Sequence, residues 1–281
     1  MRLAGVGRRY GRGGPWVLRG ADLAVEAGSL VRIEGANGSG KSTLLRIAAG
    51  IERPTEGTAD LPARRAYVPE RFPPALPFDA RGYLRGLGRI HGLDAAEAAR
   101  RTEYWLERFG IADRAGTPLG RLSKGTCQKV AVAQALIAEA DLLLLDEAWT
   151  GLDQQARTEL DDAAAERAAA GGRVLFVDHD PTRLAGFTTA AHAVDGGRLR
   201  PVAPAAPPAG PPVRIEAEGP VPAADRLPGR PAVTRTADGA TVLEVPAAHS
   251  DAVLRRLLAG GPGVHIRAVL AAAEAVREEA R

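Results

Sequence analysis

Lysine is scarce in this sequence. The chain has 281 residues, 37 of them Lys or Arg, and only three of these are lysines, namely Lys41, Lys124 and Lys129. Alanine, arginine, glycine and proline are frequent, as in chains with a coding preference for arginine over lysine. A lysine that persists against this bias is informative, because its compact ammonium charge is not reproduced by a planar guanidinium.

Cysteine, aromatic residues and long apolar runs are also rare. The single cysteine, Cys127, excludes an intrachain disulfide and fits a reducing compartment. Aromatic side chains make up 4% of the chain, so Leu, Val, Ala and Ile must build most of the core. The apolar run ADLLLLDEAW (140–149) is too short to cross a bilayer, and the first residues, MRLAGVGRRYGRGG, lack the apolar core of a signal peptide. We expect a chain that is soluble by itself and reaches a membrane only through a partner.

The charge balance gives no sign of a nucleic-acid partner. The net charge is +3, and acidic residues are interspersed with the arginines, so no basic stripe forms. The hydrophobic content of 45% predicts a packed globular core.

Local patterns predict an α/β chain up to about residue 200. Apolar and polar residues alternate over 1–34, which is typical of antiparallel strands, and two apolar runs read as strands buried on both faces. The elements expected further along the chain are a strand at 29–35, helices at 42–50, 79–93, 94–111 and 154–172, buried strands at 141–148 and 173–180, and a hairpin at 191–200. The helix at 94–111 has an aspartate N-cap, with Tyr104, Leu106 and Phe109 on or near one face.

The composition changes after residue 200. Residues 201–212 are rich in proline and alanine and are expected to form a semi-rigid linker. Residues 213–281 read as a small α+β domain, with strands at 213–219 and 241–246 and helices at 250–261 and 271–281. His249 and His265 lack metal-ligand spacing, so no metal site is expected there.

A glycine-rich stretch carries the first chemical signal. GANGSGKST (35–43) matches G-x-x-x-x-G-K-[ST] between an expected strand and an expected helix. Backbone N–H groups of such a loop bind phosphate, Lys41 supplies charge to the β- and γ-phosphates, and Ser42 is a ligand for Mg²⁺. The alternative is an ordinary turn in a glycine-rich chain. The residues expected to bind the nucleotide are Asn37, Gly38, Ser39, Gly40, Lys41, Ser42 and Thr43.

A second signal lies about a hundred residues further on. LLLLDE (142–147) is an apolar strand that ends in two carboxylates. Asp146 would lie close to the Mg²⁺ ion, and Glu147 would take a proton from an attacking water. Without the phosphate-binding loop, a buried strand leaving the core through an acidic turn would be the simpler interpretation.

The stretch LSKGT (122–126), shortly before LLLLDE, resembles the LSGGQ signature of ATP-binding cassette ATPases. The resemblance covers residues 1–200. It implies a P-loop cassette with a mixed-sheet core, an antiparallel β subdomain and a helical subdomain at about 72–135. It also implies that Ser123 and Gly125 of the signature close on the γ-phosphate of ATP held by a second cassette, with Lys124 of the signature and Lys129 adding positive charge. The alternative is a serine-capped helix with solvated lysines.

Three more positions follow the family pattern, and a fourth departs from it. By this resemblance Tyr10 stacks on adenine, Asp153 organises the dimer interface, His179 contacts the γ-phosphate, and Glu70 replaces the usual glutamine near Mg²⁺. For Tyr10 and His179 the alternatives are a core tyrosine at a strand edge and a histidine at a strand end. The other departures from the pattern are Lys124, Thr126, Ala148-Trp149-Thr150 and Asp178.

The resemblance implies an ATPase subunit of a membrane transporter. Two cassettes would bind two ATP molecules and Mg²⁺ between them as a homodimer or pseudo-dimer, on the inner face of the cell membrane, against a separate permease. The short helical region at 77–93 and the small C-terminal domain resemble those of drug-exporting cassettes, with Phe78 near the permease. The alternatives are a soluble cassette acting on ribosomes or DNA, and an ATP-gated regulatory subunit with weak turnover, which Glu70 and the altered signature would favour.

Overall fold

The computed structural model describes residues 1–11, 13–70, 72, 76–205, 212–224, 227, 229, 231–236, 239–259 and 263–271. These residues form two compact units. The first comprises Met1–Arg183 and Thr188–Pro204, and the second comprises Leu184–Phe187 and Ala205–Arg281.

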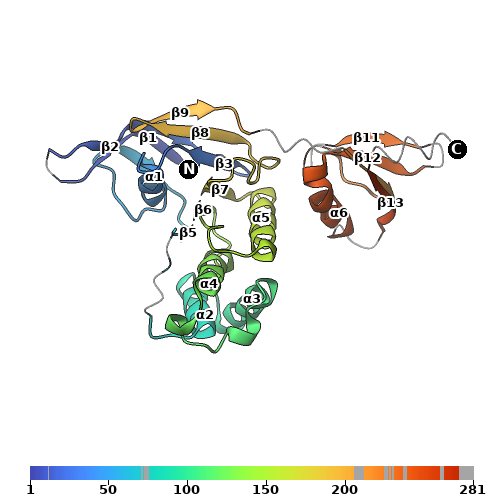
Figure 1. Ribbon diagram of the computed structural model, residues 1–281, viewed down its shortest axis with the longest axis horizontal. Coiled ribbons are helices and arrows are strands. Elements are labelled where there is room, and N and C mark those ends of the chain that lie inside the picture. Colours follow the sequence, from blue (N-terminus) through green and yellow to red (C-terminus); the bar gives the residue numbers. More distant parts are fainter. Residues whose placement is uncertain are drawn as a thin grey trace. The chain divides into compact units, whose positions relative to one another are not determined.

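The first unit holds two sheets (Figure 1). The antiparallel sheet has the order β2-β1-β4, formed by β1 (Arg2–Arg9), β2 (Trp16–Ala24) and β4 (Glu56–Asp60). The larger sheet has the order β5-β6-β7-β3-β8-β9 and is parallel except for β9. Its strands are β3 (Leu30–Glu34), β5 (Arg65–Val68), β6 (Leu142–Asp146), β7 (Arg173–Val177), β8 (Ala190–Asp195) and β9 (Arg198–Val202). This mixed sheet with a separate antiparallel sheet confirms the predicted cassette architecture.

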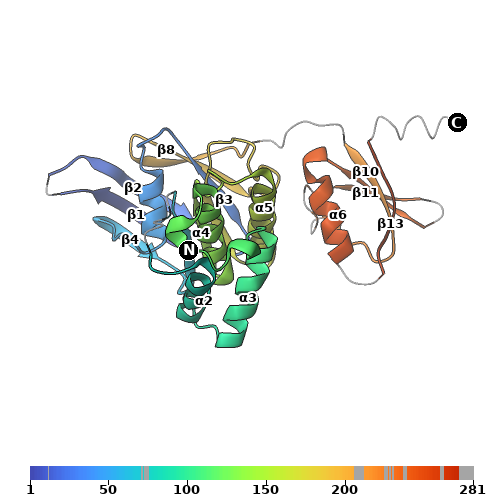
Figure 2. The ribbon, with the colours of Figure 1, turned by 60° about the horizontal axis from the view of Figure 1, so that its bottom comes forward.

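Four of the five α-helices described in this unit begin at a residue whose side chain accepts hydrogen bonds from free backbone N–H groups. The five are α1 (Lys41–Ala48), α2 (Ala80–Ile90), α3 (Ala95–Arg108), α4 (Lys124–Ile137) and α5 (Gln154–Ala169), with short 3-10 turns η1 (Ala112–Arg114) and η2 (Leu119–Arg121). The caps of α2 to α5 are Asp79, Asp94, Ser123 and Asp153, whose side chains accept from N–H groups of the first turn. Each such cap stabilises its helix by about 1 kcal/mol. Figure 2 shows α2 and α3 beside α4, which together form the helical part of the unit.

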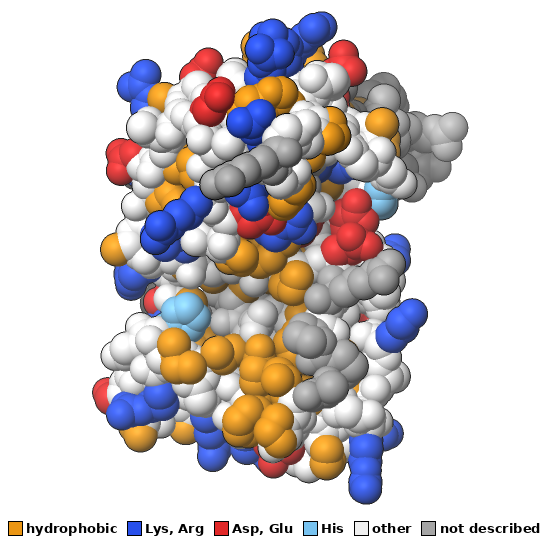
Figure 3. All heavy atoms as spheres, turned by 90° about the vertical axis from the view of Figure 1, so that its left-hand side faces the viewer, with side chains coloured by type: hydrophobic (Ala, Val, Ile, Leu, Met, Phe, Trp, Pro, Cys, Tyr) orange, Lys and Arg blue, Asp and Glu red, His pale blue; other side chains and the backbone are white. Residues whose placement is uncertain are grey.

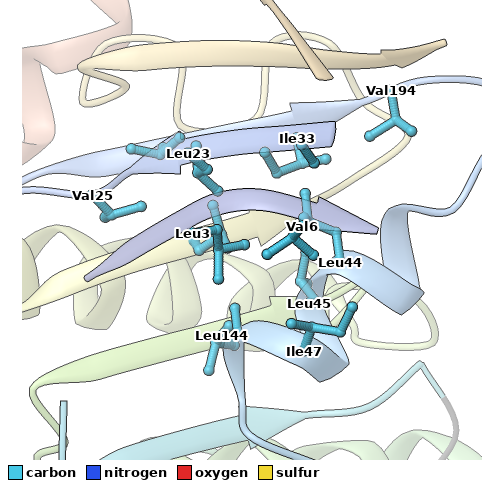
Figure 4. Packing of buried hydrophobic residues seen from close by; sticks show 14 of the residues in the cluster. Leu3, Val6, Leu23, Val25, Ile33, Leu44, Leu45, Ile47, Leu144 and Val194 are labelled. Carbon is cyan, nitrogen blue, oxygen red and sulfur yellow. The ribbon is translucent and has the colours of Figure 1, made fainter. Parts of the chain in front are cut away.

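The main core lies between the two sheets and α1. Leu3 and Val6 of β1 face Leu44 and Ile47 of α1 (Figure 4), and all four side chains are buried. Strand β6 is buried along its whole length, as expected of a parallel strand covered on both faces. Packing in this core therefore fixes α1 and β6. The ends of these two elements carry the phosphate-binding and acidic motifs.

Two sequence-based expectations need correction, and one short strand was missed. Pro201 and Val202 were assigned to the linker, but both belong to β9, where proline is tolerated because β9 is an edge strand; residues 206–211 lie outside the described part. Tyr104 was placed on the apolar face of its helix, but it is 46% exposed and the neighbouring Trp105 is buried instead. The short strand β4 was not predicted, because it has no clear alternation of apolar and polar residues.

The second unit is α+β, as predicted. A four-stranded antiparallel sheet with the order β11-β12-β10-β13 packs against one helix. Its elements are β10 (Val213–Glu218), β11 (Ala232–Arg235), β12 (Thr241–Val245), η4 (Ala247–His249), α6 (Ser250–Ala259) and β13 (His265–Ala271). The sequence predicted β10, β12 and α6 and missed β11 and β13. The expected helix at 271–281 is wrong at Ala271, which ends β13, and its remainder lies outside the described residues.

A buried histidine packs among small residues in this second unit. His249 is 2% exposed, and its ring meets Phe187 edge to face at 5.5 Å between centroids. Gly186 and Gly229 leave room for the ring, since a Cβ on either would lie within 2.5 Å of it. Burial lowers the pKa of His249, because the charged imidazolium is disfavoured away from water.

The second unit is expected to lose stability below about pH 6.5. The unfolded chain protonates His249 near that pH, and the folded unit does so only at lower pH. The free energy of unfolding therefore falls as the pH drops through this window. Amide exchange of β10 and β12, corrected for intrinsic pH effects, measures it. His249→Gln should remove the dependence, and His265→Gln, at an exposed histidine, should keep it. An identical pH dependence in wild type and His249→Gln would contradict the assignment.

Candidate functional site

The predicted motifs meet at one cavity of about 450 Å³. Of the lining residues, only Val17 and Arg46 were not singled out from the sequence. The lining residues are Val17, Asn37, Gly38, Gly40, Lys41, Ser42, Thr43, Arg46, Glu70, Glu147 and His179. The fold thus brings together the ends of β3, β5, β6 and β7 and the start of α1.

The phosphate-binding loop has the geometry that its glycines permit. Gly40 caps α1 in a left-handed conformation with φ 111°, and a Cβ there would lie 2.9 Å from the carbonyl oxygen of Val17. The N-terminus of α1 therefore presents free N–H groups and a positive dipole end to the cavity. Lys41 is 8% exposed, and its Nζ donates to the carbonyl oxygens of Gly35 at 2.8 Å and Ala36 at 3.0 Å. Those bonds hold its charge over the loop.

Ser42 and Asp146 form an oxygen-rich corner beside that loop. The Ser42 hydroxyl donates to Oδ1 of Asp146 at 3.1 Å, and the Tyr67 hydroxyl donates to Oδ2 at 2.8 Å. Burial raises the pKa of Asp146 and also that of Tyr67, which has the ionised carboxylate as a neighbour. A hydroxyl, a buried carboxylate and the carboxylate of Glu70, which lines the same cavity, are the oxygen ligands that Mg²⁺ prefers. The residues therefore fit a magnesium ion.

Glu147 and His179 both line the cavity, and their side chains form a close pair. Nε2 of His179 lies 2.9 Å from Oε2 of Glu147, and their side chains are 60% and 16% exposed. The two residues follow neighbouring parallel strands, with Asp146 of β6 paired to Val177 of β7. Glu147 has a left-handed backbone with φ 52°, and its N–H donates to the carbonyl oxygen of Val177 at 3.0 Å. Strain of this kind persists only where surrounding contacts hold it, and it clusters at functional sites.

Tyr10 and Ser39 lie beside the cavity but are not among its lining residues. The Tyr10 hydroxyl is 2.8 Å from Glu52 and 3.3 Å from Thr43 of α1, and the ring is 47% exposed with the Arg8 guanidinium 4.7 Å from its centroid. Ser39 has a buried hydroxyl without a hydrogen-bond partner among the described residues. That Tyr10 stacks on adenine remains a prediction.

The signature residues lie at the start of α4. Ser123 caps the helix by accepting from the N–H of Thr126 at 3.2 Å, and Ser123 and Lys124 are exposed. Gly125 approaches the loop before α5, since a Cβ there would lie 2.9 Å from the carbonyl oxygen of Gly151. Ser123, Lys124 and Gly125 do not line the cavity formed by their own chain.

Two side chains of α4 tie it to the loop that follows β6. Gln128 donates to the carbonyl oxygen of Ala148 at 3.1 Å. Lys129 is 2.7 Å from Asp153 and donates to the carbonyl oxygen of Phe109 at 3.0 Å. The hydrogen bond from Lys129 lowers the pKa of Asp153. The charge of Lys129 therefore stabilises its own chain, which differs from the expectation that it faces a nucleotide.

Comparisons with known proteins agree with this geometry. Residues 18–150 match the family model described as ABC transporter. The chain is 38% identical to the zinc import ATP-binding protein ZnuC of Paramagnetospirillum magneticum, over 64% of this chain and 68% of the relative. It is 33% identical to the aliphatic sulfonates import ATP-binding protein SsuB 1 of Burkholderia lata, over 94% and 74%. The chain belongs to the ABC transporter family and is one of its ATPase cassettes.

Other relatives carry export names and longer chains. The macrolide export ATP-binding/permease protein MacB 1/2 of Paracoccus denitrificans is 33% identical, and this chain spans 34% of its length. Among solved structures, an ATP-binding subunit of an ABC transporter is 26% identical, with a TM-score of 0.65 over 70% of this chain and 87% of that one. A dimeric cassette, MJ0796 bound to ADP and Pi, shares the fold with a TM-score of 0.61 at 23% identity, over 72% of this chain and 97% of that one. Among the described residues, no helix combines the length and the hydropathy that a membrane crossing requires.

Proposed function

We propose that the chain binds ATP with Mg²⁺ between two cassettes, hydrolyses it, and thereby drives export through a separate membrane permease. The observation that carries the catalytic part is the Glu147–His179 pair, 2.9 Å apart in the cavity that Lys41 also lines. A base, a hydrogen-bonding imidazole and a phosphate-binding loop in one cavity are the groups that phosphoryl transfer to water requires.

The proposed reaction uses the chain's residues mainly for positioning and charge. Loop N–H groups and Lys41 bind the phosphates, and Glu147 accepts a proton from the water whose oxygen attacks the γ-phosphorus. The bond between that phosphorus and the β-phosphate oxygen breaks, which gives ADP and phosphate. His179 orients Glu147 and hydrogen-bonds the γ-phosphate. Ser42, Asp146 and Glu70 would hold Mg²⁺, which would supply positive charge that offsets the phosphate charge.

The proposed dimer explains where the signature residues lie. Ser123, Lys124 and Gly125 are outside the cavity of their own chain, yet α4 presents Ser123 and Lys124 to solvent. A serine hydroxyl at a helix N-terminus suits an anion, here the γ-phosphate held by the other cassette. The loop of Asp153 would then lie at the interface, with its position set by Lys129.

Transport through a partner is supported by the helical part of the cassette. Phe78 is 51% exposed and Ile90, at the end of α2, is 78% exposed. Figure 3 shows hydrophobic side chains gathered in the lower half of one face, at the level of α2. Acidic and basic side chains are interspersed over the rest of that face. A permease docking there would place the chain on the inner face of the membrane. No nucleic acid is expected, because the net charge is only +3 and acidic residues are interspersed with the arginines along the sequence.

The direction of transport is the finer part of the proposal. Export is favoured by the short α2 region and the small second unit, and by similarity to the macrolide exporter and to the Nod factor export ATP-binding protein I of Cupriavidus pinatubonensis, 33% identical. The relatives named for zinc and sulfonates are importers by name. The direction of transport must therefore be established by identifying the partner protein.

The test is purification of the tagged chain from detergent-solubilised native membranes, followed by identification of co-purifying polypeptides and assay of ATP turnover. A stoichiometric multi-span protein, with turnover abolished in Glu147→Gln, supports the proposal. An accompanying solute-binding protein would point to import. Recovery only from the soluble fraction, or with ribosomes, would contradict a role in transport.

Glu70→Gln is expected to preserve ATP turnover at pH 7 or raise it a few-fold. The carboxylate adds negative charge beside the phosphates. Phosphate release at pH 7 measures the rate. Complete loss of turnover would show a specific role for the carboxylate, and a large rise would indicate that the native chain is a slow, ATP-gated regulator.

A further inference from the structure

Two positions that depart from the family pattern, Trp149 and Asp178, belong to one buried polar cluster. The indole Nε1 of Trp149 donates to Oδ1 of Asp161 at 2.8 Å. The other oxygen of Asp161 accepts from Nη1 of Arg183 at 2.9 Å, and Nε of Arg183 lies 3.9 Å from Oδ1 of Asp178. These four residues are called the Arg183 cluster. They join the loop after β6, helix α5 and the loop after β7.

The charges in the cluster depend on Arg183. Its side chain is 13% exposed and faces Asp161, Asp178 and, at 3.6 Å, Asp180. Burial raises the pKa of Asp161 and of Asp178, and the guanidinium of Arg183 acts in the opposite direction on both. The neighbouring Arg32 donates instead to the main-chain oxygen of Asp178, at 2.8 Å. Without Arg183, the mostly buried carboxylate of Asp161 loses its guanidinium partner, a costly change.

The same residues close the loop that carries His179. The N–H of Asp180 donates to Oδ1 of Asp178 at 2.8 Å, which makes a turn with His179 at its centre. The N–H of Arg183 donates to the carbonyl oxygen of Asp180 at 3.1 Å. The His179 ring is 60% exposed, so packing does little to orient it. Its distance from Glu147 is therefore set by the loop backbone.

The cluster also holds the loop that carries Glu147. Glu147 has a strained left-handed backbone, and Trp149 follows two residues later. The indole is 2% exposed, packs edge to face on Phe176 at 5.8 Å, and is anchored by Asp161. The Arg183 guanidinium lies 5.6 Å from the centroid of the Trp149 ring. The loop after β6 is thus linked through Asp161 to the guanidinium of Arg183, and Arg183 itself belongs to the loop after β7.

We propose that Arg183 is a positioning residue for the pair formed by Glu147 and His179. Held between Asp161 and Asp178, its guanidinium fixes the loop after β7 relative to the loop after β6. Nε2 of His179 then stays within hydrogen-bond reach of Glu147. Arg183 does not line the cavity and touches no substrate. The proposal rests on the ATP hydrolysis proposed above and deepens it.

The kinetic test is Arg183→Met in the assembled complex. We expect kcat to fall about 10- to 100-fold, since small misplacements of catalytic groups cost up to that much, with the Kd for ATP changed less than about twofold. Arg183→Lys should recover part of the rate. The matched control is Arg108→Met, at another mostly buried guanidinium, 2.7 Å from Glu159 and away from the cavity. It should keep kcat. Equal losses in Arg183→Met and Arg108→Met would indicate general destabilisation and overturn the proposal.

A double-mutant cycle separates positioning from folding. In a His179→Ala background, Arg183→Met should cost no further rate, because the group that it positions is gone. A full additional loss would overturn the proposal. If Arg183→Met does not fold, Arg183→Met combined with Asp161→Asn is measured in its place, because it removes the uncompensated carboxylate.

A spectroscopic measurement tests the positioning role without requiring ATP hydrolysis. In the ¹³C-histidine-labelled chain, the ring signal of His179 is assigned by its loss in His179→Ala and its response to Glu147→Gln. In Arg183→Met the chemical shift of the His179 ring should move toward its value in Glu147→Gln, whereas in Arg108→Met it should stay at the wild-type value. An unmoved signal overturns the positioning role even if the wild type hydrolyses ATP. A moved signal in a complex that hydrolyses no ATP supports the positioning geometry and overturns only the proposed function.

Discussion

Glu147→Gln is expected to lower the rate of ATP hydrolysis by a factor of about 100 to 10,000, the usual contribution of a general base. Glutamine keeps the shape of the side chain and its reach toward His179 but cannot accept a proton from water. The carboxylate lines the cavity at 16% exposure, so solvent is a poor substitute. ATP binding should persist, and two ATP-loaded chains should remain associated because the γ-phosphate is not removed. Phosphate release and size-exclusion chromatography with ATP measure both effects.

The control for this variant is Glu159→Gln. Glu159 is a carboxylate of α5, paired with Arg108 at 2.7 Å and absent from the cavity lining, so its loss should leave the rate near that of the wild type. Hydrolysis at the wild-type rate in Glu147→Gln would refute the assignment of the base. A slow variant that stays monomeric with ATP would refute the shared site and leave the base assignment standing.

Lys41→Arg is expected to reduce ATP hydrolysis by about 100-fold or more, in the range seen when one preorganised donor to a developing charge is removed. The substitution follows the bias of the chain, yet Lys41 is buried and its Nζ sits within 3.0 Å of two loop carbonyl oxygens. A guanidinium is larger and planar, and it cannot bond both carbonyls and phosphate from the same point. Binding of a fluorescent ATP analogue and phosphate release provide the measurement.

Lys129→Arg is the matched control. Lys129 is also a mostly buried lysine, but it pairs with Asp153 at 2.7 Å, a bond that a guanidinium can also make. Nucleotide binding should be unchanged in that variant. If Lys41→Arg bound and hydrolysed ATP like the wild type, the persistence of lysine at this position would have no chemical reason and the phosphate-contact role would be withdrawn.

The sequence alone was sufficient wherever structure depends on neighbours along the chain. GANGSGKST predicts a loop opening a helix, and α1 begins at Lys41 with Gly40 in the left-handed conformation. Asp94 predicts a helix N-cap and accepts from the N–H of Glu97. The run LLLLDE predicts a buried strand, and β6 is buried throughout. Caps, glycine turns and apolar runs act within a few residues, so their physics can be read locally.

Sequence-based reasoning failed where the structure of a segment depends on the residues that it packs against in the fold. Strand β13 was missed because its edge position leaves alternate residues exposed and weakens the pattern. The charge of Lys129 was assigned to a nucleotide, yet folding places it against Asp153. No local pattern indicates which carboxylate a lysine will meet.

The sequence by itself predicted the family, the phosphate-binding loop and the roles of Glu147 and His179, because each prediction rests on a contiguous motif with local chemistry. Only the tertiary structure decided that those two side chains lie 2.9 Å apart, since parallel pairing of β6 and β7 brings together strand ends that are distant in sequence. It also decided that Arg183 joins Trp149, through Asp161, to Asp178. Buried charges require compensating partners, and folding supplies those partners from loops and helices that no local pattern connects.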